Sequence, residues 1–262
     1  MTLDLDELVE GWDCPPGELR ARAVVGRDGR ELLQLRIDLG VMQMIAEGRP
    51  DGERYHGFPT ARAYIEHELC VGGEQLSAVD WQELERELLQ TNYRRMAYSA
   101  VAEEALQGSA DEGARRYIRS ALRDIEECLA DLQMIKQHGP GPEEYPALEP
   151  TLVFDRARLA AQLQIVEGQF EEAIEQAEAG ANALEELLKA LGYEDEQRAD
   201  DPGLRYLRGL GTQLRREYGI SQTLHEQLAA AIENEDFETA AEIRDEMRRR
   251  QRALPRQDEP GA

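Results

Sequence analysis

Residues 224–247 read Leu224-His-Glu-Gln-Leu228-Ala-Ala-Ala-Ile232-Glu-Asn234-Glu-Asp-Phe237-Glu-Thr-Ala240-Ala241-Glu-Ile243-Arg244-Asp245-Glu-Met247. Apolar side chains recur at helical spacing on both sides of residues 234–236, which predicts two short helices with one apolar stripe each. Asn234-Glu235-Asp236 forms the turn between them, because asparagine tolerates the left-handed conformation and Asp236 can cap the second helix. The stretch therefore predicts a helical hairpin.

A hairpin of this length buries too little apolar surface to be stable alone. Its stripe must pack on another part of the chain, on a second copy or on a partner protein, and we interpret it as a docking element. The predicted docking residues are Leu224, Leu228, Ile232, Phe237, Ala240, Ala241, Arg244, Asp245 and Met247.

The run Ala231-Ile232-x-Asn234-x-x-Phe237-x-x-Ala240-Ala241-x-Ile243-Arg244-Asp245 resembles the UVR motif. This hairpin is shared by the UvrB and UvrC excision-repair proteins, Clp-type chaperones and McsA-like activators of protein arginine kinases. The resemblance spans about residues 222–252. It implies a protein–protein contact module whose partner is another protein or a second copy of the chain. An ordinary hairpin of the core is the structural alternative.

The machinery that accompanies the motif in those families is missing from the sequence. A phosphate-binding loop needs a lysine in a Gly-x-x-x-x-Gly-Lys-Ser/Thr setting, and the two lysines, Lys136 and Lys189, lie in no such pattern. Cys14, Cys70 and Cys128 are too far apart in sequence to make a paired zinc motif. A two-histidine metalloprotease spacing is also absent. We therefore expect no catalytic residues, no metal site and no cofactor.

Composition restricts the partners and the compartment. The chain of 262 residues has a net charge of −24, and residues 143–201 contribute sixteen acidic and four basic side chains. Such a surface repels phosphate backbones, so direct nucleic-acid binding is not expected. The basic run Arg248-Arg249-Arg250 with Arg252 is explained by the dipole of a helix end, with a phosphate or acidic-partner contact as the alternative. Scattered cysteines, no signal peptide and no membrane-spanning run predict a cytoplasmic protein.

Residues 1–60 carry the strand signals of the sequence. Two alternating runs, 19–25 and 33–39, flank Gly26-Arg-Asp28-Gly29, which predicts a β-hairpin. The second strand is expected to continue through residues 41–45 with a bulge or bend at Gly40. A turn-rich loop follows from Gly48 to Phe58, and its polar side chains form an alternative small-ligand site. The residues of that alternative site are Arg49, Asp51, Arg54, Tyr55 and His56.

Residues 61–220 have helical periodicity, interrupted by a Gly- and Pro-rich linker at residues 139–150. Asp80-Trp81-Gln-Glu83 is interpreted as a capping box that opens a helix ending near Gly108. Residues 157–180 resemble one tetratricopeptide-like (TPR-like) hairpin, in which Phe170 packs between two helices and Ala173 permits their close approach. A plain antiparallel bundle is the equal alternative, because a solenoid needs about three repeats.

The predicted fold is therefore mainly α: a TPR-like array or bundle at residues 61–220, a β-ribbon at 1–60, a UVR-type hairpin at 221–252 and a disordered tail at 253–262. Two functions fit this organisation. The first is a non-catalytic cytoplasmic adaptor or regulator that docks a chaperone–protease, a kinase or a UvrB/UvrC-type partner. The second is a small-ligand-binding protein with its site at Gly48–Phe58. A DNA-repair accessory role rests on analogy alone and is opposed by the charge.

Overall fold

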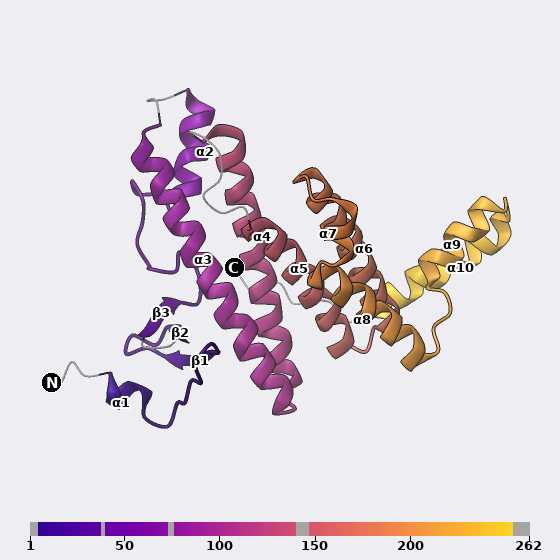
Figure 1. The fold of residues 1–262 in the computed structure, drawn as a ribbon, viewed down its shortest axis with the longest axis horizontal. Coiled ribbons are helices and arrows are strands. Elements are labelled where there is room, and N and C mark those ends of the chain that lie inside the picture. Colours follow the sequence, from indigo (N-terminus) through magenta and orange to yellow (C-terminus); the bar gives the residue numbers. More distant parts are fainter. Residues whose placement is uncertain (1–4, 38–39, 73–75, 140–146, 254–262) are drawn as a thin grey trace.

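The computed structural model describes residues 5–37, 40–72, 76–139 and 147–253. The chain is mainly helical, as predicted, with 68% of residues in helices and a small antiparallel sheet near the N-terminus. The molecule is elongated, with the sheet at one end and a projecting helical hairpin at the other (Figure 1). Among the described residues, no helix is long and apolar enough to span a bilayer.

The described residues form three strands and ten helices. The strands are β1 (Leu19–Val25), β2 (Glu31–Ile37) and β3 (Gly40–Ile45). The helices are α1 (Asp6–Val9), α2 (Ala61–Val71), α3 (Ala78–Gln107), α4 (Asp111–His138), α5 (Leu148–Val166), α6 (Phe170–Ala190), α7 (Asp195–Ala199), α8 (Pro202–Tyr218), α9 (Leu224–Glu233) and α10 (Phe237–Ala253).

The sheet contains one strand more than the predicted ribbon. β1 and β2 form the expected hairpin, but residues 41–45 are not a continuation of β2. They belong to β3, which pairs antiparallel with β2 in the register Leu35↔Met42 and Ile37↔Gly40. Alternating periodicity does not distinguish a bent strand from a reversal, and glycine at position 40 suits both. The buried face of the sheet, with Leu33 and Leu35 fully covered, packs on α3.

The long helix α3 begins earlier than the sequence indicated. Ser77, not Asp80, is the N-cap residue, and the Asp80 side chain accepts a hydrogen bond from the Ser77 backbone N–H at 2.7 Å. Asp80 therefore occupies the third helical position of the capping box. Glutamate or glutamine is usual at that position, and here an aspartate takes the same role. The helix ends at Gln107 with Gly108 as the C-cap, close to the predicted end.

The predicted linker at 139–150 is partly helical. Residues 140–146 lie outside the described residues, whereas 148–150 form the first turn of α5, where proline is tolerated because that turn has no internal partner for its N–H. The predicted disordered tail at 253–262 also lies outside the described residues, except Ala253, which ends α10. In the segment at 157–180, which the sequence analysis compared with a TPR-like hairpin, Gly168 makes the α5–α6 turn with a φ of 75°. Phe170 stacks on Tyr218 of α8, which corrects the expected packing between α5 and α6.

Helices α5 and α6 approach each other closely at Gly180. A Cβ placed on Gly180 would lie 2.0 Å from the Cβ of Ala157, a distance that no real pair of carbon atoms tolerates. By contrast, a Cβ on the helical Gly209 of α8 meets no atom within 4 Å. Gly180 therefore sets the distance between α5 and α6.

We predict that Gly180→Ala lowers the free energy of unfolding by about 1–3 kcal/mol, because the two helices must separate. Gly209→Ala is the matched control, and it should raise that free energy by up to about 1 kcal/mol through helix propensity. Urea denaturation followed by circular dichroism measures both changes. Equal effects of the two substitutions would contradict the close approach.

Charged side chains are buried where α3 meets α4 and the chain that follows β3. Arg94 is fully buried, and its guanidinium donates to both carboxylate oxygens of Asp124 on α4, at 2.7 and 2.9 Å. The same guanidinium donates to the backbone carbonyls of Ile45 and Gly48. Tyr98 adds a hydroxyl that donates to the carbonyl of Ala46 at 2.5 Å. These contacts join the sheet to both long helices.

Asp131 of α4 is the most perturbed carboxyl of this region. Burial raises its pKa to about 8, although Arg62 lies 3.3 Å away, and the neighbouring Glu87 and Glu127 raise it further. The folded protein thus holds this proton more tightly than the unfolded chain does. Its contribution to the free energy of unfolding is therefore largest at acidic pH and is lost as pH rises from about 4 to about 8.

We expect Asp131→Asn to remove this contribution. Over that pH window the wild-type free energy of unfolding should fall relative to the variant by up to about 1.4 kcal/mol per pH unit, the value for a one-proton difference. Urea unfolding at a series of pH values measures the difference. Parallel pH profiles for the two proteins would show that Asp131 is not held protonated by the fold.

Candidate functional site

Helices α9 and α10 form the hairpin that the sequence predicts. Thr223 and Glu226 make a capping box at the start of α9, and Asp236 caps α10 by accepting a hydrogen bond from the Thr239 N–H at 3.1 Å. The cap at Asp236 confirms the prediction. The left-handed residue of the turn is Glu235, with a φ of 57°, and not Asn234, whose φ is −84°. Asn234 instead donates its side-chain amide to the carbonyl of Ala230.

The interior of the hairpin is made of small side chains. Ala231 of α9 and Ala240 of α10 are its buried residues, and Leu228 and Ile243 are half-buried beside them. Alanine at both positions lets the two helices approach closely, but it leaves little apolar surface to bury between them. Nearer the body, Leu224 and Met247 are also half-buried.

The two largest apolar side chains near the turn point away from this interior. Phe237 is 67% exposed and Ile232 is 46% exposed. Ala241, Arg244 and Asp245 are exposed as well. The nine predicted docking residues thus divide between a seam inside the hairpin and an outer surface. We define the tip as the exposed residues Ile232, Phe237, Ala241 and Arg244.

The surroundings of the tip are acidic. Residues 232–242 contain five acidic side chains and no basic one. Glu233, Glu235, Glu238 and Glu242 are all exposed. The tip therefore combines the apolar Ile232 and Phe237 with an acidic rim and one cation, Arg244, at the end of the molecule that lies farthest from the sheet (Figure 1).

Polar contacts attach the base of the hairpin to the body. Arg215 of α8 donates to Glu178 of α6 at 2.9 Å and to Glu226 of α9 at 2.7 Å. His225 contacts Glu175 at 2.7 Å, and the Arg250 guanidinium donates to Glu171 at 3.0 Å. The Arg215 contact joins three helices, and the neighbouring guanidinium lowers the pKa of the Glu226 carboxyl.

We predict that Arg215→Gln loosens the hairpin without unfolding the body. Amide hydrogen exchange in α9 and α10 should accelerate by up to about fivefold, because partly exposed ion pairs contribute about 0.2–1 kcal/mol each. Exchange in α3 and α4 should not change. Arg208→Gln is the matched control, since Arg208 joins α8 to Glu185 of α6 but does not reach the hairpin. Equal exchange in both variants would contradict the role of Arg215.

The Gly48–Phe58 loop uses its polar side chains within the chain. Arg49 is buried and forms ion pairs with Glu83 and, at 3.1 Å, with Asp51. The Arg54 guanidinium donates to the carbonyl of Gly57. The Tyr55 hydroxyl donates to Asp80 at 2.7 Å, and burial together with this hydrogen bond raises the pKa of the phenol. The His56 ring stacks on Tyr64. These contacts fasten the loop to α2 and α3.

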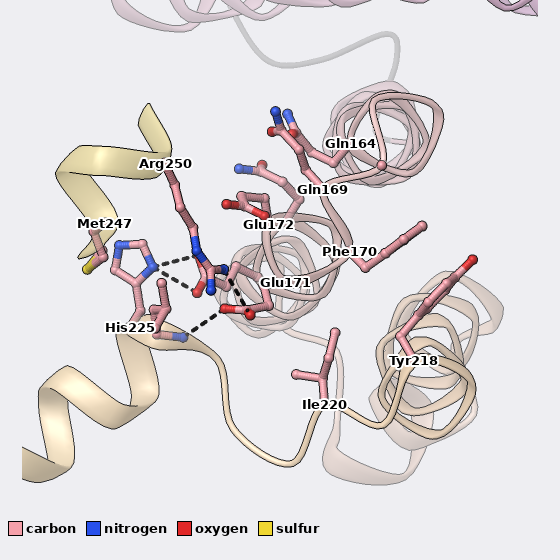
Figure 2. Close-up of a pocket in the computed structure, with 14 residues that line it drawn as sticks. Gln164, Gln169, Phe170, Glu171, Glu172, Tyr218, Ile220, His225, Met247 and Arg250 are labelled. Atoms are coloured by element: carbon pink, nitrogen blue, oxygen red, sulfur yellow. Dashed lines mark hydrogen bonds and ion pairs between the residues drawn. The ribbon is translucent and has the colours of Figure 1, made fainter. Parts of the chain in front are cut away.

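A cleft of about 700 Å³ lies where the hairpin joins the body (Figure 2). Its walls come from α5, the start of α6, the end of α8 and the base of the hairpin. The sequence analysis did not find it, because its lining residues are spread from position 164 to position 250. Phe170 and Tyr218 stand on one side with parallel rings 3.5 Å apart, and Arg250 and His225 stand on the other.

Within the described residues, no group of three or more His, Cys, Asp or Glu side chains is arranged to hold a metal ion.

Comparison with protein families confirms the resemblance of the hairpin. Residues 222–252 match the family model described as UVR, the UvrB/uvrC motif, which is typically a protein-interaction hairpin. The match covers α9 and α10 up to residue 252. Comparison of the chain with curated proteins and with solved structures found no match. The class defined by fold and site is thus a helical protein that carries a C-terminal UVR motif.

Proposed function

We propose that this protein is a non-catalytic adaptor or regulator that captures another protein through the tip of its UVR hairpin. The observation that carries the proposal is the exposure of Phe237, at 67%, on a hairpin that projects from the body. Large aromatic side chains are costly to leave in water and are enriched at the centres of protein interfaces. Their exposure at the end of an interaction motif favours docking over a core role.

The acidic rim indicates the chemistry of the partner. A second copy of the chain would place five acidic side chains of residues 232–242 against the same five. Like charges brought together across an interface are unfavourable. We therefore infer a different protein, which presents an apolar groove bordered by basic residues. The long-range attraction between such surfaces also speeds their association.

The motif suggests which partners to test first. Chaperone–protease systems, kinases and UvrB/UvrC-type proteins are the partner classes that the family resemblance implies. In this proposal the protein acts in the cytoplasm, and its helical body holds the hairpin at a fixed orientation through Arg215. Direct contact with nucleic acid is no part of the proposal, because the net charge of −24 opposes it.

Phe237→Asp tests the proposal. Capture of the partner should be lost, whereas the free energy of unfolding should change by less than about 1 kcal/mol, since the side chain is mostly exposed. The matched control is Val25→Asp, because Val25 is 77% exposed on the sheet at the opposite end. Retention of proteins from host lysate on the immobilised variants, at increasing salt, measures capture.

The partner should be retained by wild type and by Val25→Asp, and its retention should weaken as salt screens the acidic rim. Capture that persists in Phe237→Asp would contradict a docking role of the tip. If light scattering shows a wild-type dimer that Phe237→Asp abolishes, the partner of the tip is a second copy of the chain and not a basic protein. A large loss of stability in Phe237→Asp would mean that the side chain is buried.

The alternative, a small-ligand site at Gly48–Phe58, stays a prediction. Arg49 and Tyr55 are occupied by Glu83 and Asp80, so a ligand there would have to displace internal contacts. For this reason we rank it below the adaptor function.

A further inference from the structure

The cleft between the hairpin and the body has its own chemistry, separate from that of the tip. We propose that this cleft binds a guanidinium group, carried by an arginine side chain of a peptide or by a small organic compound. The proposal rests on the acceptors, the aromatic pair and the apolar wall that the cleft brings together (Figure 2).

The cleft has more negative than positive charge. Glu171, Glu172 and Glu175 of α6 all line it, and Arg250 and His225 face them from the hairpin. Arg250 is paired with Glu171, and His225 with Glu175. No described residue donates a hydrogen bond to Glu172 or forms an ion pair with it. One carboxylate of the cleft is therefore available to a cation.

A second unused acceptor lies on the neighbouring helix. Gln164 of α5 is one of the residues that line the cleft, and its side-chain oxygen is buried without a hydrogen-bond partner among the described residues. A buried acceptor without a partner costs about 1–3 kcal/mol, so a ligand that supplies a donor is favoured there. Gln164 and Glu172 together call for a ligand with several N–H donors, which a guanidinium has in a fixed planar arrangement.

The aromatic side of the cleft suits the flat face of the same group. Phe170 and Tyr218 are stacked with an angle of 11° between their rings, and Tyr218 remains 41% exposed. Guanidinium groups stack on aromatic faces and are attracted by their negative charge distribution. Ile220, Leu224 and Met247 supply an apolar wall for the methylene stem that carries the guanidinium.

The structure already contains one example of this recognition. The guanidinium of Arg250 enters the cleft and sits on Glu171 at 3.0 Å. The volume of about 700 Å³ leaves room beside it. This volume is also within the range of about 300–1,000 Å³ that is usual for small-molecule sites. Arg250 is thus both a precedent for the ligand and a like charge that weakens its binding.

Isothermal titration calorimetry on the full chain tests the proposal with matched probes. N-acetyl-arginine amide is compared with N-acetyl-citrulline amide, which has the same shape but no charge. The peptide acetyl-Leu-Arg-Leu-amide and its citrulline counterpart form the second arm. The arginine probes should bind and the citrulline probes should bind at least about tenfold more weakly, as expected for loss of a charge-assisted contact.

Three variants locate the binding site. Glu172→Gln should weaken arginine binding by about tenfold through the same lost charge. Glu186→Gln is the matched control on the exposed surface of α6 and should have no effect. Arg250→Gln should strengthen binding, because it removes the competing charge and frees Oε1 of Glu171, whose Oε2 still accepts from the Leu224 N–H. If Arg250 had a purely structural role, its loss would not make arginine binding tighter.

The two arms identify the source of the guanidinium. Binding of the single amino-acid amide identifies a small compound as sufficient, whereas binding of the peptide alone assigns the site to arginine within a polypeptide. Equal binding of arginine and citrulline probes, no binding of either arginine probe, or full binding to Glu172→Gln would overturn the proposal. Phe237→Asp should bind the probes normally and Glu172→Gln should still capture the partner, so the tip and the cleft can fail independently.

Discussion

The buried ion pair between Arg94 and Asp124 is the contact on which the body depends. It joins α3 to α4, and through the carbonyls of Ile45 and Gly48 it also holds the chain that follows the sheet. Removal of one partner of such a pair leaves an uncompensated buried charge, which costs about 3–5 kcal/mol. Arg94, Arg49 and Tyr98 direct their polar groups inward, so buried ion pairs and hydrogen bonds join the elements at this end of the molecule.

At the opposite end of the molecule, the hairpin of α9 and α10 directs its largest apolar side chains outward. Ala231 and Ala240 bring α9 and α10 close together, so the larger Ile232 and Phe237 have no place in the hairpin interior. Partly exposed ion pairs at Arg215 and Arg250, instead of a shared apolar core, fix the hairpin to α6 and α8. The body is therefore firmly packed, and the hairpin carries the apolar, acid-rimmed tip at its far end. The cleft lies at the other end of the hairpin, where the hairpin joins the body.

Local patterns were enough to predict the hairpin, its cap at Asp236 and most helix ends, because spacing, capping and glycine stops act within a few residues. They were insufficient at Gly40, where a bend and a reversal have the same signature, and at Arg94, where a charged residue of a helix looks solvated until its partner thirty residues away is known. Periodicity placed Phe237 on one stripe with Ala240, but only packing shows that alanine fills the seam and phenylalanine does not. The cleft has no sequence signal, because its walls meet only in the folded chain.

The most direct measurement places a photoreactive benzoyl-phenylalanine at position 237, with position 25, which is at least as exposed, as a reference on the sheet. Irradiation in host lysate or with a purified partner should yield one dominant cross-link from position 237, to a basic-rimmed apolar segment of another protein. The same probe at position 25 should give none. A cross-link of equal yield from both positions, or none from position 237, would contradict the account of the tip as a docking surface.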